Sequence, residues 1–161
     1  MTSLHRDVMV PVYIEIMQGS KTKYEYDKIQ SKLIVDRMLD TQEGYPYAYG
    51  FIPHTLADDG DDLDVLIITN TSIPNDTHYK VYIIGALVME DEKGMDEKIL
   101  CVLPEDYKTI RDISDLSMKI KEKLNTFFST YKLNVPGKWS KTYGFINKND
   151  AIKLYERTLC V

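Results

Sequence analysis

The first two thirds of the chain alternate short apolar runs with turn-forming segments. The runs are rich in Val, Ile and Tyr, and polar segments with Gly, Pro or Asn separate them. They are VMVPVYIEI (8–16), KYEYD (23–27), KLIVDR (32–37), VLIIT (65–69), YKVYIIGALVM (79–89) and KILCVL (98–103). Because β-branched and aromatic residues favour strands, and Gly, Pro and Asn favour turns, this part of the chain predicts a curled antiparallel sheet or a small barrel.

The spacing of apolar residues becomes helical in the last third of the chain. Apolar residues recur at steps of three and four at Leu116, Ile120, Leu124, Phe127 and Tyr131. This spacing places them on one face of a helix whose start is marked by Ser114 or Asp115 and which ends before NVPG (134–137). A second, shorter helix is predicted from about residue 149 to 159.

Length and composition limit the classes of protein that the chain can belong to. We expect a single domain over residues 1–161, because 43% of them are hydrophobic and no linker or repeat divides them. Acidic residues outnumber basic ones 25 to 20, which argues against nucleic acid as a partner, since such binding needs Lys and Arg to neutralise phosphates. Without a run of about 20 apolar residues or the apolar core of a signal peptide, we expect no membrane association and a cytoplasmic location.

The segment ADDGDDLDVLI (57–67) places five carboxylates within seven positions and leads into a predicted strand. Carboxylates this close raise the free energy needed to ionise one another unless a cation lies among them. Asp59 and Asp61 flank Gly60 in a turn, and Asp64 stands at the start of the strand, so the three can converge. Such oxygen ligands suit Mg²⁺ or Mn²⁺. The alternative is a solvated acidic turn; an EF-hand loop is excluded, because its first, third and twelfth positions would lack carboxylates.

Further charged and hydroxyl groups stand near the ends of other predicted elements. Asp91 and Asp96 flank a glycine turn that precedes Lys98, and Lys23 and Glu25 share one strand. Each pair alone is typical of a polar turn or a solvated strand. Other groups that could bind a phosphate are Arg37, Tyr45, Tyr49, Tyr131 and Lys132. Together with the carboxylates they predict a site for a magnesium-bridged polyphosphate, although neither a Walker A motif nor a GxGxxG loop is present.

In this combination the sequence resembles the soluble family I inorganic pyrophosphatases. The segment DGDDLDVL is similar to the signature of that family, through Asp59, Asp61 and Asp64. The other similar blocks follow in order: YIEI with Glu15, KYEYDK with Lys23 and Glu25, VDR with Arg37, YPYAYGFIPHTL with Tyr45 and Tyr49, DEKGMDEK with Asp91, Asp96 and Lys98, and FFSTYK with Tyr131 and Lys132. The resemblance covers nearly the whole chain.

The resemblance implies a fold, a reaction and an assembly. The fold would be α+β but mainly β: a twisted five-stranded β-barrel of the OB type with two helices packed outside it. The reaction would be hydrolysis of pyrophosphate to two orthophosphates with several Mg²⁺ ions per active site, for which Mn²⁺ or Zn²⁺ could substitute. Prokaryotic members of the family are commonly hexamers, so a chain of this length is expected to form a homo-oligomer, namely a hexamer.

The resemblance also implies a role for each matching residue. The metal ligands would be Asp59, Asp64, Asp91, Asp96 and Glu25. Glu15 and Tyr45 would contact these ligands without binding the metal themselves. The phosphates would be bound by Lys23, Arg37, Tyr49, Lys98, Tyr131 and Lys132. Asp61 would orient the attacking water or accept its proton, and Tyr49 and Lys132 would also take part in catalysis.

Plainer interpretations of the same residues stay open at this point. Tyr45 and Tyr49 could be core aromatics with solvated hydroxyls, Tyr131 could be a core residue of its helix, and Arg37 could pair only with Asp36 or Asp40 on the surface. For the whole protein, the alternatives are an OB-type domain that binds nucleic acid or sugar, and a cation store without turnover. The acidic composition and the lack of interleaved basic and aromatic residues count against the nucleic-acid alternative.

Overall fold

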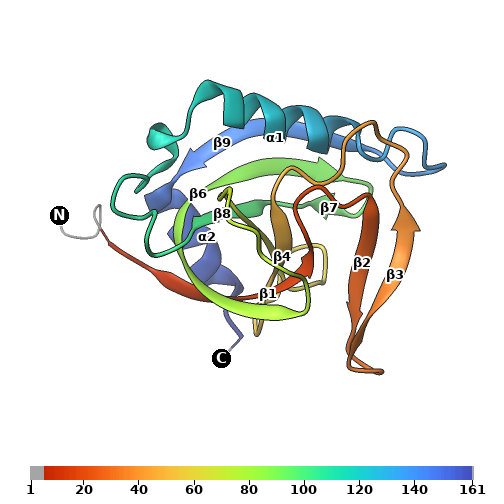
Figure 1. Cartoon of the computed structure of the whole chain (residues 1–161), viewed down its shortest axis with the longest axis horizontal. Coiled ribbons are helices and arrows are strands. Elements are labelled where there is room, and N and C mark those ends of the chain that lie inside the picture. Colours follow the sequence, from red (N-terminus) through yellow and green to blue (C-terminus); the bar gives the residue numbers. More distant parts are fainter. Residues whose placement is uncertain (1–5, 161) are drawn as a thin grey trace.

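A computed structural model describes residues 6–160 of the chain (Figure 1). Residues 1–5 and residue 161 lie outside the described part. The segment for which no signal peptide is predicted includes residues 1–5, so that prediction falls partly on residues that are not described. The strands are β1 (Met9–Ile16), β2 (Thr22–Asp27), β3 (Lys32–Met38), β4 (Ala48–Ile52), β5 (Leu63–Ile67), β6 (Thr77–Asp91), β7 (Gly94–Met95), β8 (Lys98–Val102) and β9 (Ser140–Asn147). The helices are α1 (Met118–Thr130), α2 (Lys148–Thr158) and the short 3-10 helix η2 (Ile113–Asp115).

Five strands close into a barrel. They follow the order β1, β4, β5, β8 and β6, and β6 pairs back to β1, so that the ring has no free edge. All pairs are antiparallel except β5 and β8, which are parallel. The 15-residue strand β6 is long enough to pair with β1 along its first half and with β9 along its second half. This arrangement confirms the predicted mainly β fold with a five-stranded barrel and two helices.

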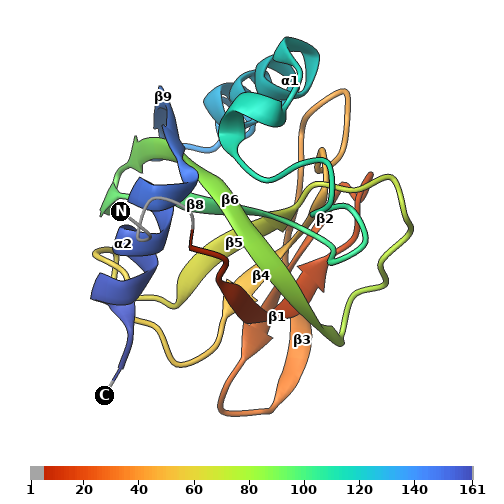
Figure 2. The ribbon, with the colours of Figure 1, turned by 90° about the vertical axis from the view of Figure 1, so that its left-hand side faces the viewer.

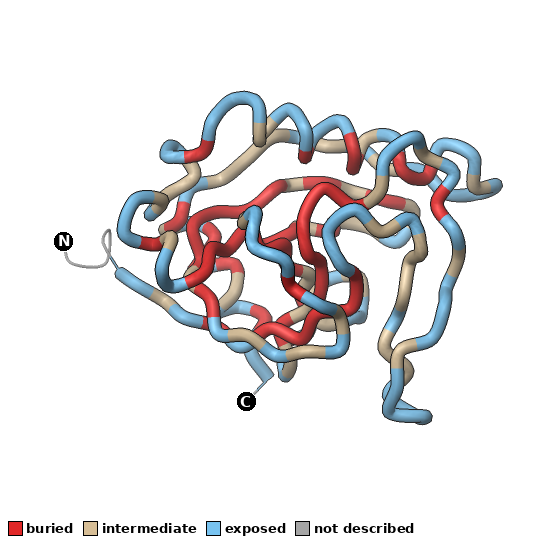
Figure 3. The backbone as a smooth tube through the Cα atoms, viewed as in Figure 1, coloured by how far each residue is buried: buried red, intermediate tan, exposed pale blue. Residues whose placement is uncertain are grey.

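Two apolar cores share the barrel wall, because successive side chains of a strand point to opposite faces. On β5, Leu63, Val65 and Ile67 join the inner core, to which all five barrel strands and α2 contribute. Leu66 joins the outer core, which α1 covers with Leu124 and Phe128. Figures 1 and 2 show α1 lying across one side of the barrel and α2 beside another. Figure 3 shows the buried residues concentrated in the barrel. Burial on both faces explains the continuous apolar run at this strand.

The helix in the last third begins later than predicted. The prediction of a start at Ser114 or Asp115 is wrong, because these residues belong to the separate turn η2, whose first turn is capped by Asp112. The helix α1 begins at Met118, where the side chain of Ser117 accepts a hydrogen bond from the backbone N–H of Ile120. No helix in the described part of the chain is long and apolar enough to cross a membrane.

Three strands were not predicted from the sequence: β4, β7 and β9. Glycine obscures the strand pattern in each of them, at Gly50, Gly94 and Gly144. The barrel leaves no room for a side chain at Gly50, since a Cβ there would lie 1.9 Å from the backbone oxygen of Tyr13 on β1. Strand β9 forms because the second half of β6 offers it a partner, which a local pattern does not reveal.

Strands β2 and β3 form a separate two-stranded sheet that stands beside the barrel (Figure 1). The hairpin is attached through Tyr26, whose backbone N–H donates to Glu15 on β1 at 2.9 Å and whose ring lies 5.0 Å from that of Tyr13. A register shift leaves Asp36 without a direct partner between Val35 and Arg37. The hairpin therefore forms one wall of a space between itself and the barrel, and this space contains the predicted site.

Candidate active site

A cleft of about 320 Å³ lies between the β2–β3 hairpin, the acidic loop before β5, the turns around β7 and the segment after α1. All predicted site residues except Tyr45 line it. They are Glu15, Lys23, Glu25, Arg37, Tyr49, Asp59, Asp61, Asp64, Asp91, Asp96, Lys98, Tyr131 and Lys132. Segments that are far apart in the sequence thus meet in one cleft, as the resemblance implied.

The parallel pairing of β5 with β8 brings the central carboxylates together. Asp64 on β5 is the register partner of Lys98 on β8, so the residues that precede both strands lie at the same end of the barrel. Oxygens of Asp59, Asp64 and Asp96 come within 4.8 Å of one another. The turn before β5 is closed by Asp59, whose side chain accepts a hydrogen bond from the backbone N–H of Asp61 at 3.0 Å, with Gly60 at a φ of 89°.

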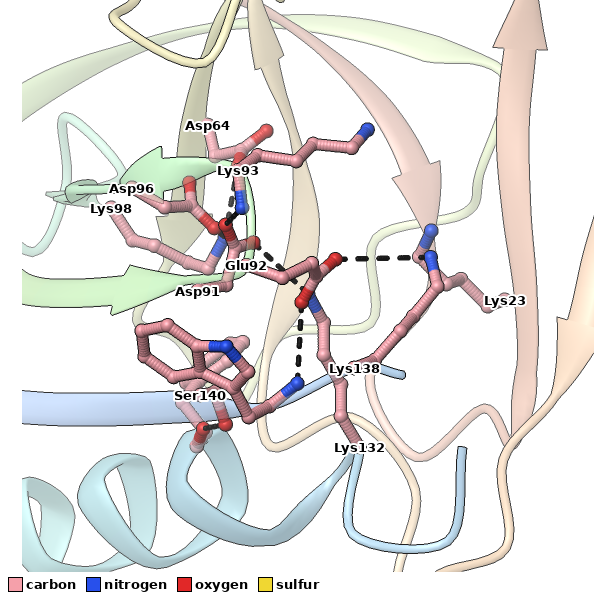
Figure 4. A network of polar contacts seen from close by, with 12 residues as sticks. Lys23, Asp64, Asp91, Glu92, Lys93, Asp96, Lys98, Lys132, Lys138 and Ser140 are labelled. Atoms are coloured by element: carbon pink, nitrogen blue, oxygen red, sulfur yellow. Dashed lines mark hydrogen bonds and ion pairs between the residues drawn. The ribbon is translucent and has the colours of Figure 1, made fainter. Parts of the chain in front are cut away.

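A buried ammonium group, that of Lys98, contacts two of these carboxylates, Asp64 and Asp96 (Figure 4). Lys98 is 1% exposed, and its Nζ donates to Asp64 at 2.9 Å, to Asp96 at 3.0 Å and to the hydroxyl of Tyr49 at 2.7 Å. Burial disfavours the charge of this lysine, but the carboxylates of Asp64 and Asp96 outweigh the burial and raise its pKa well above the ordinary value. Lys98 is therefore charged at neutral pH.

The carboxylate cluster fits a hard divalent cation. Burial raises the pKa of Asp59, and it also raises the pKa of Asp96 despite the opposing effect of Lys98. Ionisation of these two carboxyls is therefore less favourable than that of an exposed aspartate, and added positive charge would favour it. The cluster Asp59, Asp64 and Asp96 offers only oxygen donors, with neither imidazole nor thiolate, and this is the set that Mg²⁺ prefers.

A second lysine pairs with a second carboxylate in the cleft. Lys132 lies 3.0 Å from Asp91, and both side chains are largely buried. Burial lowers the pKa of Lys132, but Tyr131, Asp91 and Glu92 outweigh the burial, so that its pKa lies above the ordinary value. Tyr131 itself is buried at the end of α1 but also lines the cleft, so it is both a core residue and a site residue.

The hairpin wall carries two positive groups. Lys23 pairs with Asp36 at 2.6 Å, whereas Asp40 accepts a hydrogen bond from Asn134. Among the described residues Arg37 forms no ion pair with Asp36 or Asp40, so the alternative in which it pairs only with one of them is wrong. The Nε of Arg37 is buried without a hydrogen-bond partner among the described residues. Its guanidinium carbon lies 5.9 Å from the centroid of the Tyr131 ring, at the wall of the cleft.

Tyr45 and Tyr49 lie one behind the other. Their ring centroids are 5.2 Å apart, and Tyr45 also packs against Phe127 at 4.9 Å. Tyr49 reaches the cleft, whereas Tyr45 is 1% exposed and does not line it. The alternative of a solvated hydroxyl is wrong for Tyr45, because its hydroxyl oxygen is buried. Burial raises the pKa of both phenols, so both keep their protons at neutral pH.

Several cleft residues were missed by the sequence analysis. They are Lys28, Asp36, Asp62, Glu92, Lys93 and Lys138, together with the aromatic residues Tyr24, Tyr26 and Phe51. Asp36 and Glu92 each adjoin a predicted site residue, and this adjacency is the one sequence signal for them. Lys28 and Asp62 form an ion pair of 2.8 Å between the hairpin and the acidic loop, which only the folded arrangement reveals.

Comparisons with known proteins agree with this geometry. The family model for inorganic pyrophosphatase matches residues 12–160. The chain is 44% identical over 153 residues to the inorganic pyrophosphatase of Helicobacter pylori (strain J99 / ATCC 700824), an alignment that covers 92% of this chain and 88% of the relative. It is 46% identical over 152 residues to that of Nanoarchaeum equitans (strain Kin4-M), covering 92% and 94%.

Solved structures show the same fold. The inorganic pyrophosphatase of Helicobacter pylori superposes with a TM-score of 0.90 at 41% identity, covering 94% of this chain and 91% of that one. The enzyme from Thermus thermophilus gives 0.90 at 38% identity, covering 94% and 89%. The chain therefore belongs to the family of inorganic pyrophosphatases. Its activity is the hydrolysis of inorganic pyrophosphate, that of an inorganic diphosphatase.

The pKa of Glu15 makes the stability of the metal-free protein depend on pH. Burial, with a smaller contribution from Asp64, raises this pKa from 4.5 to about 7, although the N–H of Tyr26 opposes the shift. The stability contributed by protonated Glu15 is therefore complete below pH 4.5 and is lost as the pH rises through 7. The side chain in Glu15→Gln stays neutral at all pH values. We therefore expect the free energy of unfolding of this variant, relative to that of the parent protein, to increase by up to about 3 kcal/mol from pH 5 to pH 8.

Urea unfolding in the presence of EDTA at both pH values measures this gain. Glu43→Gln, at an exposed carboxylate outside the cleft, serves as the control and should show no such trend. The prediction is contradicted if the difference in free energy of unfolding between Glu15→Gln and the parent protein stays constant from pH 5 to pH 8.

Proposed function

We propose that the chain uses Mg²⁺ as its cofactor in the hydrolysis of pyrophosphate, and that Asp61 accepts the proton of the water molecule that attacks in line. The observation that carries this proposal is the meeting of the Asp59, Asp64 and Asp96 carboxylates with two buried lysines in one cleft. Hydrolysis of a phosphoric anhydride requires positive charge on both phosphates and a positioned nucleophile. The cleft offers groups suited to each of these tasks.

The residues that would hold the cations form three sets along the cleft. Asp59, Asp64 and Asp96 make the first, and Asp91 with Asp96 would hold a further ion, while Glu25 on the hairpin would hold another. When bound, divalent ions neutralise charge on the substrate and lower the pKa of a coordinated water molecule toward neutrality. Mn²⁺ and Zn²⁺ are candidate substitutes for Mg²⁺, because carboxylates also bind them.

Groups that can bind phosphate lie on two walls of the cleft, and this supports the binding of one phosphate of the substrate at each wall. Lys98, Tyr131 and Lys132 would bind the phosphate under attack, since all three lie at the barrel and at the end of α1. Lys23 and Arg37 would bind the leaving phosphate from the hairpin, since they are paired on β2 and β3 and both line the cleft. Tyr49 orients Lys98 through their hydrogen bond and would place its own hydroxyl near the substrate.

Asp61 is suited to the proton transfer by its position. It lines the cleft in the turn next to Asp59, and its side chain is exposed. A carboxylate beside divalent cations is ordinarily a weak base, because the cations lower its pKa. Asp61 could still accept the proton, because the pKa of the attacking water would itself be lowered by bound cations.

The proposal extends to the assembly and location of the protein. Large apolar side chains on the surface, among them Val35, Met38 and Leu133, support a homo-oligomer, since contacts between copies would remove them from water. We propose that this homo-oligomer is a hexamer and that it is located in the cytoplasm. The excess of acidic residues counts against nucleic acid as a partner.

Replacement of Asp61 tests the proposed base. We expect Asp61→Asn to lower turnover of pyrophosphate at least about a hundredfold, because a positioned acid or base contributes on that scale. The fold should stay intact, since the side chain is exposed. Colorimetric phosphate release with Mg²⁺ measures the loss, with Asp58→Asn as the control in the same loop but outside the cleft. Turnover of Asp61→Asn close to that of the control would exclude this role.

Replacement of single carboxylates tests which of them bind cations before the substrate arrives. We expect Asp64→Asn to weaken Mg²⁺ binding without substrate at least about tenfold, and more than Asp91→Asn does, because Asp64 belongs to the three-carboxylate cluster. The two variants are matched, since each leaves its lysine with one other carboxylate, Asp96 or Glu92. Calorimetric titration of the metal-free proteins gives both affinities, and the reverse order would reject this assignment.

A further inference from the structure

Glu92 lines the cleft but has no role in the mechanism above. It follows Asp91, the last residue of β6, in the turn that leads to β7. This turn is fixed by Asp91, whose side chain accepts a hydrogen bond from the backbone N–H of Lys93 at 2.9 Å. The side chain of Glu92 points from the turn toward Lys132 and Lys138, in the segment after α1 (Figure 4).

Three groups of that segment converge on the one carboxylate. Its Oε1 accepts a hydrogen bond from the backbone N–H of Trp139 at 3.3 Å and lies 3.6 Å from the Nζ of Lys132. Its Oε2 lies 3.9 Å from the Nζ of Lys138. The side chain of Glu92 is 20% exposed, so water screens these contacts less than it would screen ion pairs on the open surface.

The segment from residue 131 to 139, named here the lysine loop, takes its shape from local turns. Leu133 bonds to Thr130, Val135 to Lys132 and Lys138 to Val135 through backbone hydrogen bonds of 3.1 to 3.2 Å. Such bonds define the shape of a loop but do not fix its position against the barrel. Contacts from outside the loop are needed for that. Asp91 makes one at Lys132 and Asp40 makes one at Asn134. Glu92 contacts Lys132 as well, and it alone of these carboxylates also contacts the far end of the loop, at Lys138 and Trp139.

Asp91 alone is poorly suited to hold Lys132 during the reaction. It contacts Lys132 at 3.0 Å in this structure, but it is also a proposed cation ligand. A carboxylate that shares its charge with a divalent ion attracts an ammonium group less strongly. Glu92 is outside the proposed ligand set, so its charge stays available to Lys132.

We propose that Glu92 is a positioning residue that fastens the lysine loop to the β6–β7 turn and thereby places Lys132 to bind the phosphate under attack. This inference rests on the function proposed above for Lys132. It assigns Glu92 no contact with the substrate. Its effect is carried through the backbone of Trp139 and the charges of Lys132 and Lys138.

The chain contains its own reporter for the position of the loop. Trp139 is its single tryptophan, and its side chain is 46% exposed. Quenching of its fluorescence by acrylamide therefore measures how open the loop is, without substrate or turnover. The test variants are Glu92→Ala and Glu92→Gln. The matched control is Glu90→Gln, two residues earlier on β6, where the carboxylate accepts a hydrogen bond from the hydroxyl of Tyr143 and does not line the cleft.

We expect Glu92→Ala to increase the quenching of Trp139 and to raise the KM for pyrophosphate about tenfold, with kcat reduced less than about threefold. Glu92→Gln should keep the quenching of the parent protein, because its amide oxygen still accepts from the N–H of Trp139. It should nevertheless raise KM, because the charge that faces Lys132 and Lys138 is lost. Glu90→Gln should match the parent protein in both measurements.

The inference is overturned if Glu92→Gln leaves KM unchanged, or if the quenching of Trp139 is the same in Glu92→Ala as in the parent protein. Should Glu92→Ala fail to fold, Glu92→Gln still provides the test through KM. Lys132→Met separates this result from a failure of the proposed function. An unchanged KM in Lys132→Met refutes the role of Lys132 itself, whereas the quenching result concerns only the attachment of the loop.

Discussion

The cleft depends on the pairing of one buried ammonium group with two carboxylates. Lys98 is almost completely buried, and its contacts with Asp64 and Asp96 leave none of these charges isolated. An unpaired charge in such surroundings would destabilise the fold by several kcal/mol. The pairing exists because β5 and β8 run parallel with Asp64 beside Lys98. The barrel register and the electrostatics of the site therefore constrain each other, since a shift by one residue would turn these side chains to opposite faces.

The same balance of charge connects the structure with the reaction. In the metal-free protein, Lys98 and Lys132 neutralise carboxylates that are proposed to bind cations. With cations among those carboxylates, both lysines would have positive charge to offer a phosphate. In the proposed mechanism the two lysines thus pair first with carboxylates of the protein and then, once cations have bound, with phosphates of the substrate. Glu92 would keep Lys132 in place during this exchange.

The residues at the centre of the candidate site, which the structure brings into one cleft, could be identified from the sequence because they lie in short local motifs. Asp59, Asp61 and Asp64 share one turn and strand, and Asp91, Asp96 and Lys98 share the next. Their meeting required only that two strands begin at the same end of the barrel, as β5 and β8 do. Strand periodicity also predicted β1, β2, β3, β5, β6 and β8.

The remainder depends on contacts between distant segments. Glycines obscured β4 and β9, whose positions are set by their partner strands. The start of α1 was misplaced because two capping residues, Asp112 and Ser117, lie close together and the first begins a separate turn. Asp36 and Glu92 were missed because their partners, Lys23 and the lysine loop, become their neighbours only through a register shift and a folded turn.

A crystal structure with Mn²⁺, using its anomalous scattering, tests the central claim most directly. The account predicts a manganese peak in the cleft with oxygens of Asp59, Asp64 and Asp96 as ligands. It would be contradicted if the cleft contained no such peak, or if the three side chains faced separate surfaces of the protein.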